Sequence, residues 1–474
     1  MAVVAYVGNS RRDDYEESGH AVDIIQKPRS TGSLLKPMLF AAMLQSGEIL
    51  PTTLVPDLPI QYGGFVPENY DRRYRGTVPA REALARSLNV PSLRLLREHG
   101  VSRFHAFLKN LGMTTLFRSP EDYGLTLILG GAEGTLWDLA GFYSNLAWIA
   151  QDCAKAYEET YKALRLLKGD SVQTSRRIEF GSGAAWLTLQ ALLEVARPEE
   201  EVHWKNFASS QKIGWKTGTS FGHRDAWAIG TNARYTVGVW AGNASGEGRP
   251  DLTGTTCAAP ILFETFNRLG PGGWFPMPEP DLKQVEVCRN DGFLAVPGCE
   301  TEKQWVPLDS HFEQPSPYHR LIHLDSTDRW RVHGACESVT KMTHKTWFVL
   351  PSAQEYFFKR YHPDYRPPPS LRADCRDDPA VRQNPIAFLY PRENARIYIP
   401  VDLNAQKSRT IFEAVHRQQE AVLYWHLDGQ YLGQTELFHQ KSLDIPPGPH
   451  AITVVDHIGN RITRRFEVLG KSQP

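Results

Sequence analysis

A serine and a lysine three residues apart form the first pattern in this sequence that could do chemistry. Ser33 and Lys36 occur in the run Ser-Leu-Leu-Lys, and residues three apart share one face of a helix. A serine hydroxyl becomes an effective nucleophile when a neighbouring group accepts its proton. A lysine can accept it when burial or a second cation lowers the lysine pKa. We therefore interpret Ser33 as an acyl-transfer nucleophile and Lys36 as its base.

A second motif supplies another cation and groups suited to binding a carboxylate. It reads Lys216-Thr217-Gly218-Thr219 and precedes strand-like sequence. Lys216 would be the cation that lowers the pKa of Lys36. The hydroxyls of Thr217 and Thr219 could bind a substrate carboxylate. Gly218 would let an extended peptide approach the strand edge closely.

A third motif, Ser87-Leu88-Asn89, lies between the other two. Ser87 could relay a proton from the lysine base to a leaving amine. Asn89 could hold a substrate amide with its two-ended carboxamide. The backbone N–H groups of Ser33 and Thr219 would form an oxyanion hole for the tetrahedral intermediate.

The elements that must position these motifs fall in residues 1–275. Apolar residues at three- and four-residue steps predict helices at Leu34–Gln45, Ala80–His99, Val101–Leu111, Leu136–Ala150 and Ser182–Ala196. Strand-like runs are Val3–Val7, Ala226–Thr231 and Tyr235–Ala241, with a hairpin at 232–234. Because the helices lie between one early strand and the later ones, we expect an α/β (α+β) domain with an antiparallel-dominated sheet, not alternating β-α-β units.

Residues 276–380 form a second segment, in which proline is frequent and periodicity fades. We expect a connector with little regular structure. Four of the six cysteines lie in it, and the disulfides that we favour join Cys288 to Cys299 and Cys336 to Cys375. Six cysteines allow fifteen pairings, and buried free thiols are the alternative.

Residues 381–474 form a third segment with an all-β pattern. Short strands are predicted at Ile386–Tyr390, Arg396–Val401, Thr410–His416, Val422–Leu427, Ala451–Val455 and Ile462–Val468. Asp428-Gly429 marks a hairpin turn. The close strand spacing predicts an immunoglobulin-like sandwich. Trp425 and Tyr431 could line a binding surface there, although strand alternation favours core packing for at least one of them.

Composition argues against several functional classes. The 474 residues carry 53 basic and 53 acidic side chains, so no net charge points to nucleic acid. The sequence contains no run of about 18 uncharged apolar residues, the length that could span a membrane. The opening residues, 1–8, resemble a strand and not a signal peptide, so we expect a fragment whose membrane anchor lies upstream. His-Glu-x-x-His and Cys-x-x-Cys spacings are missing, so we expect no metal and no cofactor.

The three motifs together resemble those of penicillin-binding proteins and class A β-lactamases. Longer matches resemble the bifunctional class A penicillin-binding proteins. These matches are Pro28–Pro37, Pro67–Tyr70, Ala83–Pro91 and Trp215–Gly230. The last of them, together with the β-rich C-terminal segment, resembles the type 1C subgroup in particular.

This resemblance implies a transpeptidase fold in which Ser33 is acylated and Lys36 is its base. It implies peptidoglycan stem peptides ending in D-Ala–D-Ala as donors, β-lactams as covalent inhibitors, and a periplasmic site with an anchor in the inner membrane. It also implies an upstream glycosyltransferase domain that this chain lacks, so we expect no glycan polymerisation here. The C-terminal domain could bind other cell-wall synthesis proteins.

Alternatives stay open at this point. Water as the acceptor would make the enzyme a DD-carboxypeptidase, and a weakly catalytic chain could serve as a scaffold or binding module. Class A β-lactamases use a glutamate-activated water for deacylation, but Glu133 lies in a segment that resembles an ordinary transpeptidase loop, and we interpret it as structural. A second Ser-x-x-Lys run at Ser338–Lys341 has no companion motifs, so we interpret it as a chance match.

Overall fold

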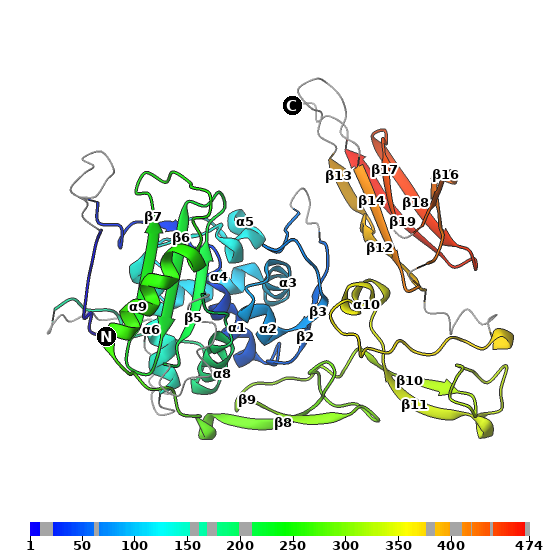
Figure 1. Ribbon diagram of the computed structural model, residues 1–474, viewed down its shortest axis with the longest axis horizontal. Coiled ribbons are helices and arrows are strands. Elements are labelled where there is room, and N and C mark those ends of the chain that lie inside the picture. The colour runs from blue at the N-terminus through cyan, green and yellow to red at the C-terminus, as the bar shows by residue number, and fades with distance from the viewer. Residues whose placement is uncertain are drawn as a thin grey trace.

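The computed structural model describes residues 1–9, 22–60, 66–151, 161–167, 178–198, 211–375, 384–398, 410–418, 420–436 and 439–469. Figure 1 shows three parts in chain order: a helical part with a small sheet in blue to green, two strand pairs with one helix in green to yellow, and a strand-rich part in orange to red. Within the described residues, no helix is long and apolar enough to cross a lipid bilayer.

The helical part is built around α1. Its helices are α1 (Lys36–Ser46), α2 (Ala80–Ala85), α3 (Asn89–His99), α4 (Val101–Asn110), α5 (Pro120–Tyr123), α6 (Leu136–Ala150), α8 (Ser182–Leu193) and α9 (Ala259–Leu269). Its strands are β1 (Arg29–Ser30), β2 (Leu54–Asp57), β3 (Gly76–Pro79), β4 (Glu133–Gly134), β5 (Gly214–Thr219), β6 (Asp225–Thr231) and β7 (Thr236–Gly242). Residues 36–44 of α1 are all buried, so this helix lies inside the core instead of at its surface.

The antiparallel sheet β5-β6-β7 has helices on both faces. Its register puts Lys216 and Gly238 on one face and Trp215 on the other. The Trp215 ring lies 5.0 Å, centroid to centroid, from Phe263 in α9. A Cβ on Gly238 would lie 2.9 Å from Leu136 in α6. Lys216 therefore points away from α9, toward the helical core.

The predicted helices on an antiparallel sheet are confirmed, and α6 has the predicted bounds. The strand predicted at Val3–Val7 is wrong. No residue of Val3–Val7 is assigned to a strand, and the nearest bridge is an isolated one between Ala2 and Arg165. Val4 and Val7 are 76% and 72% exposed, whereas Tyr6 packs against the core beside Trp137. The segment therefore contacts the core through single side chains and not as a paired strand.

The connector has more regular structure than predicted. It contains the antiparallel pairs β8 (Leu282–Cys288) with β9 (Thr301–Pro307) and β10 (His319–Leu324) with β11 (Thr343–Phe348), followed by α10 (Ser352–Phe358). A second core includes Phe293, Phe312, Tyr318 and Phe358 of the connector, together with Leu50 and Leu54 of the helical part. Because these aromatic residues are irregularly spaced and come from loops as well as regular elements, a periodicity search does not detect them.

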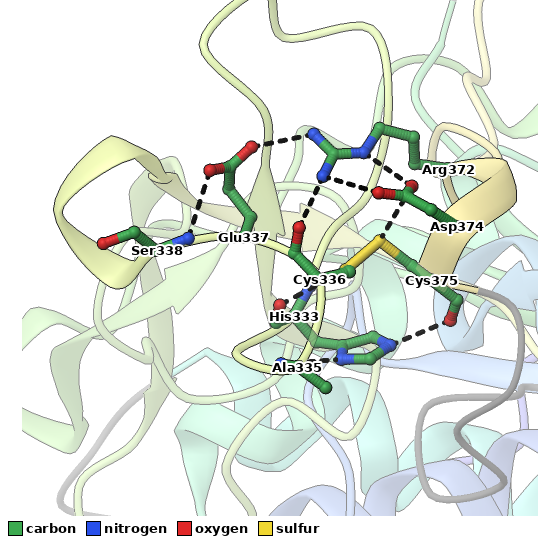
Figure 2. Close-up of a disulfide and its surroundings, with 8 residues drawn as sticks. All are labelled: His333, Ala335, Cys336, Glu337, Ser338, Arg372, Asp374 and Cys375. Carbon is green, nitrogen blue, oxygen red and sulfur yellow. Dashed lines mark hydrogen bonds and ion pairs between the residues drawn. A yellow bond between two sulfur atoms is a disulfide. The ribbon is translucent and has the colours of Figure 1, made fainter.

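Two disulfides tie the connector together. Cys288 is bonded to Cys299, and Cys336 to Cys375. Figure 2 shows the second bond beside Arg372, which donates to the Cys336 carbonyl and pairs with two carboxylates, Glu337 and Asp374. This bond fixes the end of the connector to the loop that joins β10 to β11.

Two sheets pack around one core in the C-terminal part. Their strands are β12 (Ile386–Tyr390), β13 (Ala395–Tyr398), β14 (Thr410–His416), β15 (Leu423–Leu427), β16 (Gln430–Thr435), β17 (Gln440–Leu443), β18 (Gly448–Asp456) and β19 (Arg461–Leu469). The strand orders are β12-β14-β17 and β13-β19-β18-β15-β16, and both sheets contribute to the core. The pairing is antiparallel except between β13 and β19.

The structure also tests the predicted hairpin turn and the two aromatic residues of the C-terminal part. Asp428 and Gly429 have φ of 51° and 84°, so the predicted hairpin turn between β15 and β16 is confirmed. Trp425 is fully buried, whereas Tyr431 is 54% exposed. The expectation that at least one of the two packs in the core is therefore confirmed for Trp425, whose side chain fills the core between the sheets.

Helix α10 joins the C-terminal part to the helical part (Figure 1). Arg417, which follows β14, pairs with the buried Glu355 of α10 at 2.9 Å. Its carbonyl accepts a hydrogen bond from Lys359 at 2.9 Å. On another side of α10, a Cβ on Gly76 in β3 would lie 2.1 Å from the Gln354 carbonyl. Helix α10 therefore contacts both neighbours without intervening space.

Candidate active site

Ser33 lies in the turn that leads into α1. The Lys36 N–H donates to the Ser33 carbonyl at 3.3 Å, which winds this turn tightly. Gly32 has a φ of 53°, and a Cβ there would lie 2.6 Å from the backbone N of Thr219. Only glycine adopts this conformation at that distance without strain. The serine turn therefore lies against the end of β5, beside the second predicted oxyanion donor.

Lys36 is 3% exposed and faces the third motif. Its Nζ donates to the carbonyls of Ser87 at 2.9 Å and Leu88 at 3.2 Å, and to Asn89 Oδ1 at 2.8 Å. Burial, and then the nearby charge of Lys216, holds the pKa of Lys36 well below its usual value. A neutral amine has two N–H groups and one lone pair, so accepting a proton from Ser33 requires Lys36 to release one of these bonds.

Lys216 reaches the same turn from β5. It is fully buried, and its Nζ donates to the Ser87 hydroxyl at 2.7 Å and to the Thr217 carbonyl at 2.9 Å. Burial lowers the pKa of Lys216 to about 7. The two lysines thus contact one serine, Lys36 at its carbonyl and Lys216 at its hydroxyl. The lowered pKa of each lysine makes its neutral form more accessible than that of an ordinary lysine.

The Ser87 turn breaks the helix that the sequence predicts over Ala80–His99. Helix α2 ends at Ala85 and α3 begins at Asn89. Ser87 has a φ of 55°, a left-handed conformation that an L-residue rarely adopts. The signal that could have found this break is Pro91, since proline is tolerated in the first turn of a helix and not in its interior.

Asn89 begins α3 with its side chain already bound at both ends. Its Oδ1 accepts from Lys36, and its Nδ2 donates to the Glu68 carbonyl at 2.9 Å. A substrate amide would therefore replace one of these partners. Sequence reasoning assigned no role to Glu68, whose contribution is a backbone carbonyl that no side-chain motif reveals.

The Thr-Gly-Thr end of β5 lies along the serine turn. A Cβ on Gly218 would lie 2.7 Å from the Thr31 carbonyl. Thr217 and Thr219 are half-buried at the strand's end. The Thr219 hydroxyl accepts a hydrogen bond at 3.1 Å from the backbone N–H of Gly254, at the start of a short helical turn before α9. Sequence reasoning missed Gly254, whose N–H orients the hydroxyl of Thr219, a residue predicted to bind the substrate carboxylate.

The structure therefore brings the predicted residues of all three motifs together from distant segments. Glu133, by contrast, is paired with Arg118 at 2.7 Å, and its strand β4 pairs with β1. The lysine of the second Ser-x-x-Lys run, Lys341, is exposed.

Two groups of described residues have side chains close enough to suggest metal ligands. They are His333 with Cys336 and Cys375, and Cys288 with Asp291 and His319. In both groups the cysteine sulfurs are bonded in disulfides, so the thiolates that bind zinc are not available. Cys257 is a free thiol, and Cys153 lies outside the described residues.

Comparison with known families agrees with this geometry. Residues 1–245 match the family described as the penicillin binding protein transpeptidase domain, which is more than half of the chain. Residues 376–466 match the penicillin-binding protein C-terminus family. The chain belongs to the penicillin-binding protein transpeptidase family.

Individual curated relatives are also named as penicillin-binding proteins. The chain is 36% identical over 270 residues to penicillin-binding protein 1C of Escherichia coli, covering 57% of this chain and 33% of that protein. It is 28% identical over 252 residues to penicillin-binding protein 1B of Vibrio cholerae, covering 51% and 31%. The chain spans about a third of the length of these curated relatives.

Two solved structures match part of this chain. The match to penicillin-binding protein 1A of Haemophilus influenzae has a TM-score of 0.48 and 19% identity, and covers 62% of this chain and 50% of that one. The match to PonA1 of Mycobacterium tuberculosis in complex with penicillin V has a TM-score of 0.45 and 20% identity, and covers 54% and 74%.

Proposed function

We propose that this chain is a peptidoglycan DD-transpeptidase that works through an acyl-enzyme on Ser33. The Ser33 oxygen attacks the carbonyl between the two D-alanines of a stem peptide, and its proton passes to Lys36. The N–H groups of Ser33 and Thr219 stabilise the oxyanion. The bond to the terminal D-alanine then breaks, and Ser87 delivers a proton to the departing amine. An acceptor amine displaces Ser33 and forms the crosslink.

The observation that carries this proposal is the placement of two buried lysines around one serine. Their lowered pKa values allow one lysine to be neutral while its neighbour stays charged. Ser87 gives its carbonyl to Lys36 and its hydroxyl to Lys216. Relay of the proton from Lys36 to the leaving amine therefore requires the Ser87 hydroxyl to turn from Lys216 toward Lys36. Thr217 and Thr219 would bind the terminal carboxylate beside the Lys216 charge.

The finer expectations belong to the same proposal. We infer a periplasmic protein whose complete form is anchored in the inner membrane, with β-lactams as covalent inhibitors. We infer an immunoglobulin-like character for the C-terminal two-sheet domain and a role for it in binding other cell-wall synthesis proteins. We propose domain limits near residues 275 and 380, supported by a core centred in each of the three parts, with Leu282 packed in the first core and Leu50 and Leu54 in the connector core.

Intact mass after incubation with a penicillin tests the nucleophile. The chain should gain one penicillin mass, and Ser33→Ala should gain none. Ser338→Ala is the matched control, because it removes the serine of the other Ser-x-x-Lys run and should acylate as the parent does. An adduct on Ser33→Ala would show that the nucleophile is assigned wrongly.

Product analysis then separates the two acceptors. A donor pentapeptide is incubated with an amine-bearing acceptor peptide, and the products are separated by mass. A crosslinked dimer supports transpeptidation. Release of D-alanine with only hydrolysed tetrapeptide would instead assign DD-carboxypeptidase activity to the same Ser33 acyl-enzyme.

A further inference from the structure

The segment Pro67-Glu68-Asn69-Tyr70 holds the start of α3 from outside that helix. Asn69 is 2% exposed, and its Oδ1 accepts from the backbone N–H groups of Asn89 at 2.9 Å and Val90 at 3.1 Å. The residue at the N-cap of α3, Leu88, makes no side-chain cap. The first N–H groups of a helix need an acceptor from elsewhere, and Asn69 supplies it for two of them.

A buried carboxylate fixes which way the Asn69 carboxamide faces. Asn69 Nδ2 donates to Asp57 Oδ1 at 2.7 Å and to the Arg73 carbonyl at 2.9 Å. Asp57 is fully buried, and its other oxygen accepts from the Arg75 N–H at 3.0 Å. Because an ionised carboxylate only accepts hydrogen bonds, the amide nitrogen must face Asp57. The amide oxygen is therefore left to face α3.

The contact continues to the lysine base. Asn69 holds the backbone of Asn89, and the adjacent Glu68 carbonyl holds the Asn89 side chain at 2.9 Å. Held in this way, Asn89 presents its Oδ1 to Lys36 at 2.8 Å. A chain of hydrogen bonds thus runs from Asp57 in β2 through Asn69 and Asn89 to the amine of Lys36.

We propose that Asn69, oriented by Asp57, is a positioning residue that sets the placement of Asn89 and through it of Lys36. This inference rests on the proposed acyl transfer. It gives a role to the segment at 67–70, which lies outside the three motifs. A displacement of about 1 Å at a reacting group costs up to about 100-fold in rate. We therefore expect roughly 10- to 100-fold slower acylation when Asn69 loses its orientation.

A reciprocal exchange of the two side chains tests the proposal. Asn69→Asp places two carboxylates against each other. Asp57→Asn leaves one side-chain oxygen at position 57 to accept from both the Asn69 Nδ2 and the Arg75 N–H. Each single variant should acylate more slowly. The double variant again pairs one carboxylate with one carboxamide, so its acylation rate should recover to within several-fold of the parent. A residue that supports only folding would show no such recovery in the rate of the folded fraction.

The measurements are stopped-flow acylation by a fluorescent penicillin, normalised to the final adduct, and thermal unfolding. Saturation curves separate the acylation rate constant from the initial binding constant, and the rate constant should fall in the single variants. Asn145→Ala is the control, because Asn145 is also fully buried and binds the backbone at Gly141 and Lys162. It should lower the unfolding temperature without slowing acylation.

The outcomes distinguish this inference from the function on which it rests. If the parent forms no Ser33-dependent adduct, both are overturned. If the parent acylates and Asn69→Asp acylates equally fast, the positioning role alone is overturned. If Asn69→Asp does not fold, the double variant decides: a folded double variant near the parental rate supports the role, and one that stays slow contradicts it.

Discussion

Lys216 donates a hydrogen bond from its Nζ to the Ser87 hydroxyl across 2.7 Å. The same serine gives its carbonyl to Lys36 at 2.9 Å. One residue thus stands between the base that would deprotonate the nucleophile and the cation that adjusts the pKa of that base. The following predictions depend on this arrangement.

Ser87→Ala should slow penicillin acylation by roughly 100-fold or more, the usual contribution of a positioned acid–base group. The variant removes the hydroxyl that accepts from Lys216 and leaves that buried Nζ with one protein acceptor in place of two. The second-order acylation rate constant is the measurement. Ser46→Ala, at the far end of α1, is the control and should acylate normally. Parental speed in Ser87→Ala would remove this serine from the proton path.

Lys216→Gln should move the rising limb of the acylation pH profile to higher pH. Burial and then the Lys216 charge lower the pKa of Lys36, so losing that charge raises the pKa. The base acts in its neutral form, which then requires a higher pH. Acylation rates from pH 5 to 9 measure the shift. Lys341→Gln, an exposed lysine, should leave the profile unchanged, and an unmoved limb in Lys216→Gln would contradict the coupling.

Gly32→Ala should abolish most of the acylation as well as some stability. Its Cβ would lie 2.6 Å from the Thr219 nitrogen, which pushes one oxyanion donor out of place and costs about 100- to 1,000-fold. Gly273→Ala separates the effects, because Gly273 also has a positive φ but no atom within 4 Å of the added Cβ. Both variants should unfold at lower temperature, and only Gly32→Ala should lose adduct formation on intact mass.

Arg417→Ala should destabilise the protein by about 1.5–3 kcal/mol, because it removes the guanidinium that pairs with the buried Glu355 and leaves Lys359, at 3.3 Å, as its ion-pair partner. Denaturant unfolding gives the free energy. Arg396→Ala breaks an exposed pair with Glu467 and should change it by less than about 1 kcal/mol. Equal effects of the two substitutions would mean that the contact between α10 and the C-terminal domain contributes no more than a surface ion pair.

The sequence predicts elements well where periodicity comes from one face packing on a core. Helix α6 and strands β12 and β14 have the predicted bounds. Strands β16 and β17 were not predicted, because Gln430–Thr435 and Gln440–Leu443 are largely polar and exposed on one side. Strand β16 pairs with β15 across the hairpin turn, whereas β17 pairs with β14, which is distant in the sequence.

The motifs identified the side chains of the site better than its backbone. Ser33, Lys36 and Lys216 could be chosen by residue type. The positive φ of Ser87 and the carbonyl of Glu68 could not, because any residue type supplies a carbonyl and apolar periodicity runs through the Ser87 break. Asn69 was visible only as part of a family-like segment, since its role comes from a fully buried hydrogen-bond arrangement.

The left-handed backbone of Ser87 has a consequence for engineering. An L-residue in that conformation costs of order 1–2 kcal/mol, and glycine relieves the cost. A screen for thermal stability alone would therefore favour glycine at position 87. Because glycine lacks the Ser87 hydroxyl, we expect the selected variants to be more stable and to react slowly with penicillin. A screen for thermal stability would select glycine at position 87, and a screen for acylation would select serine.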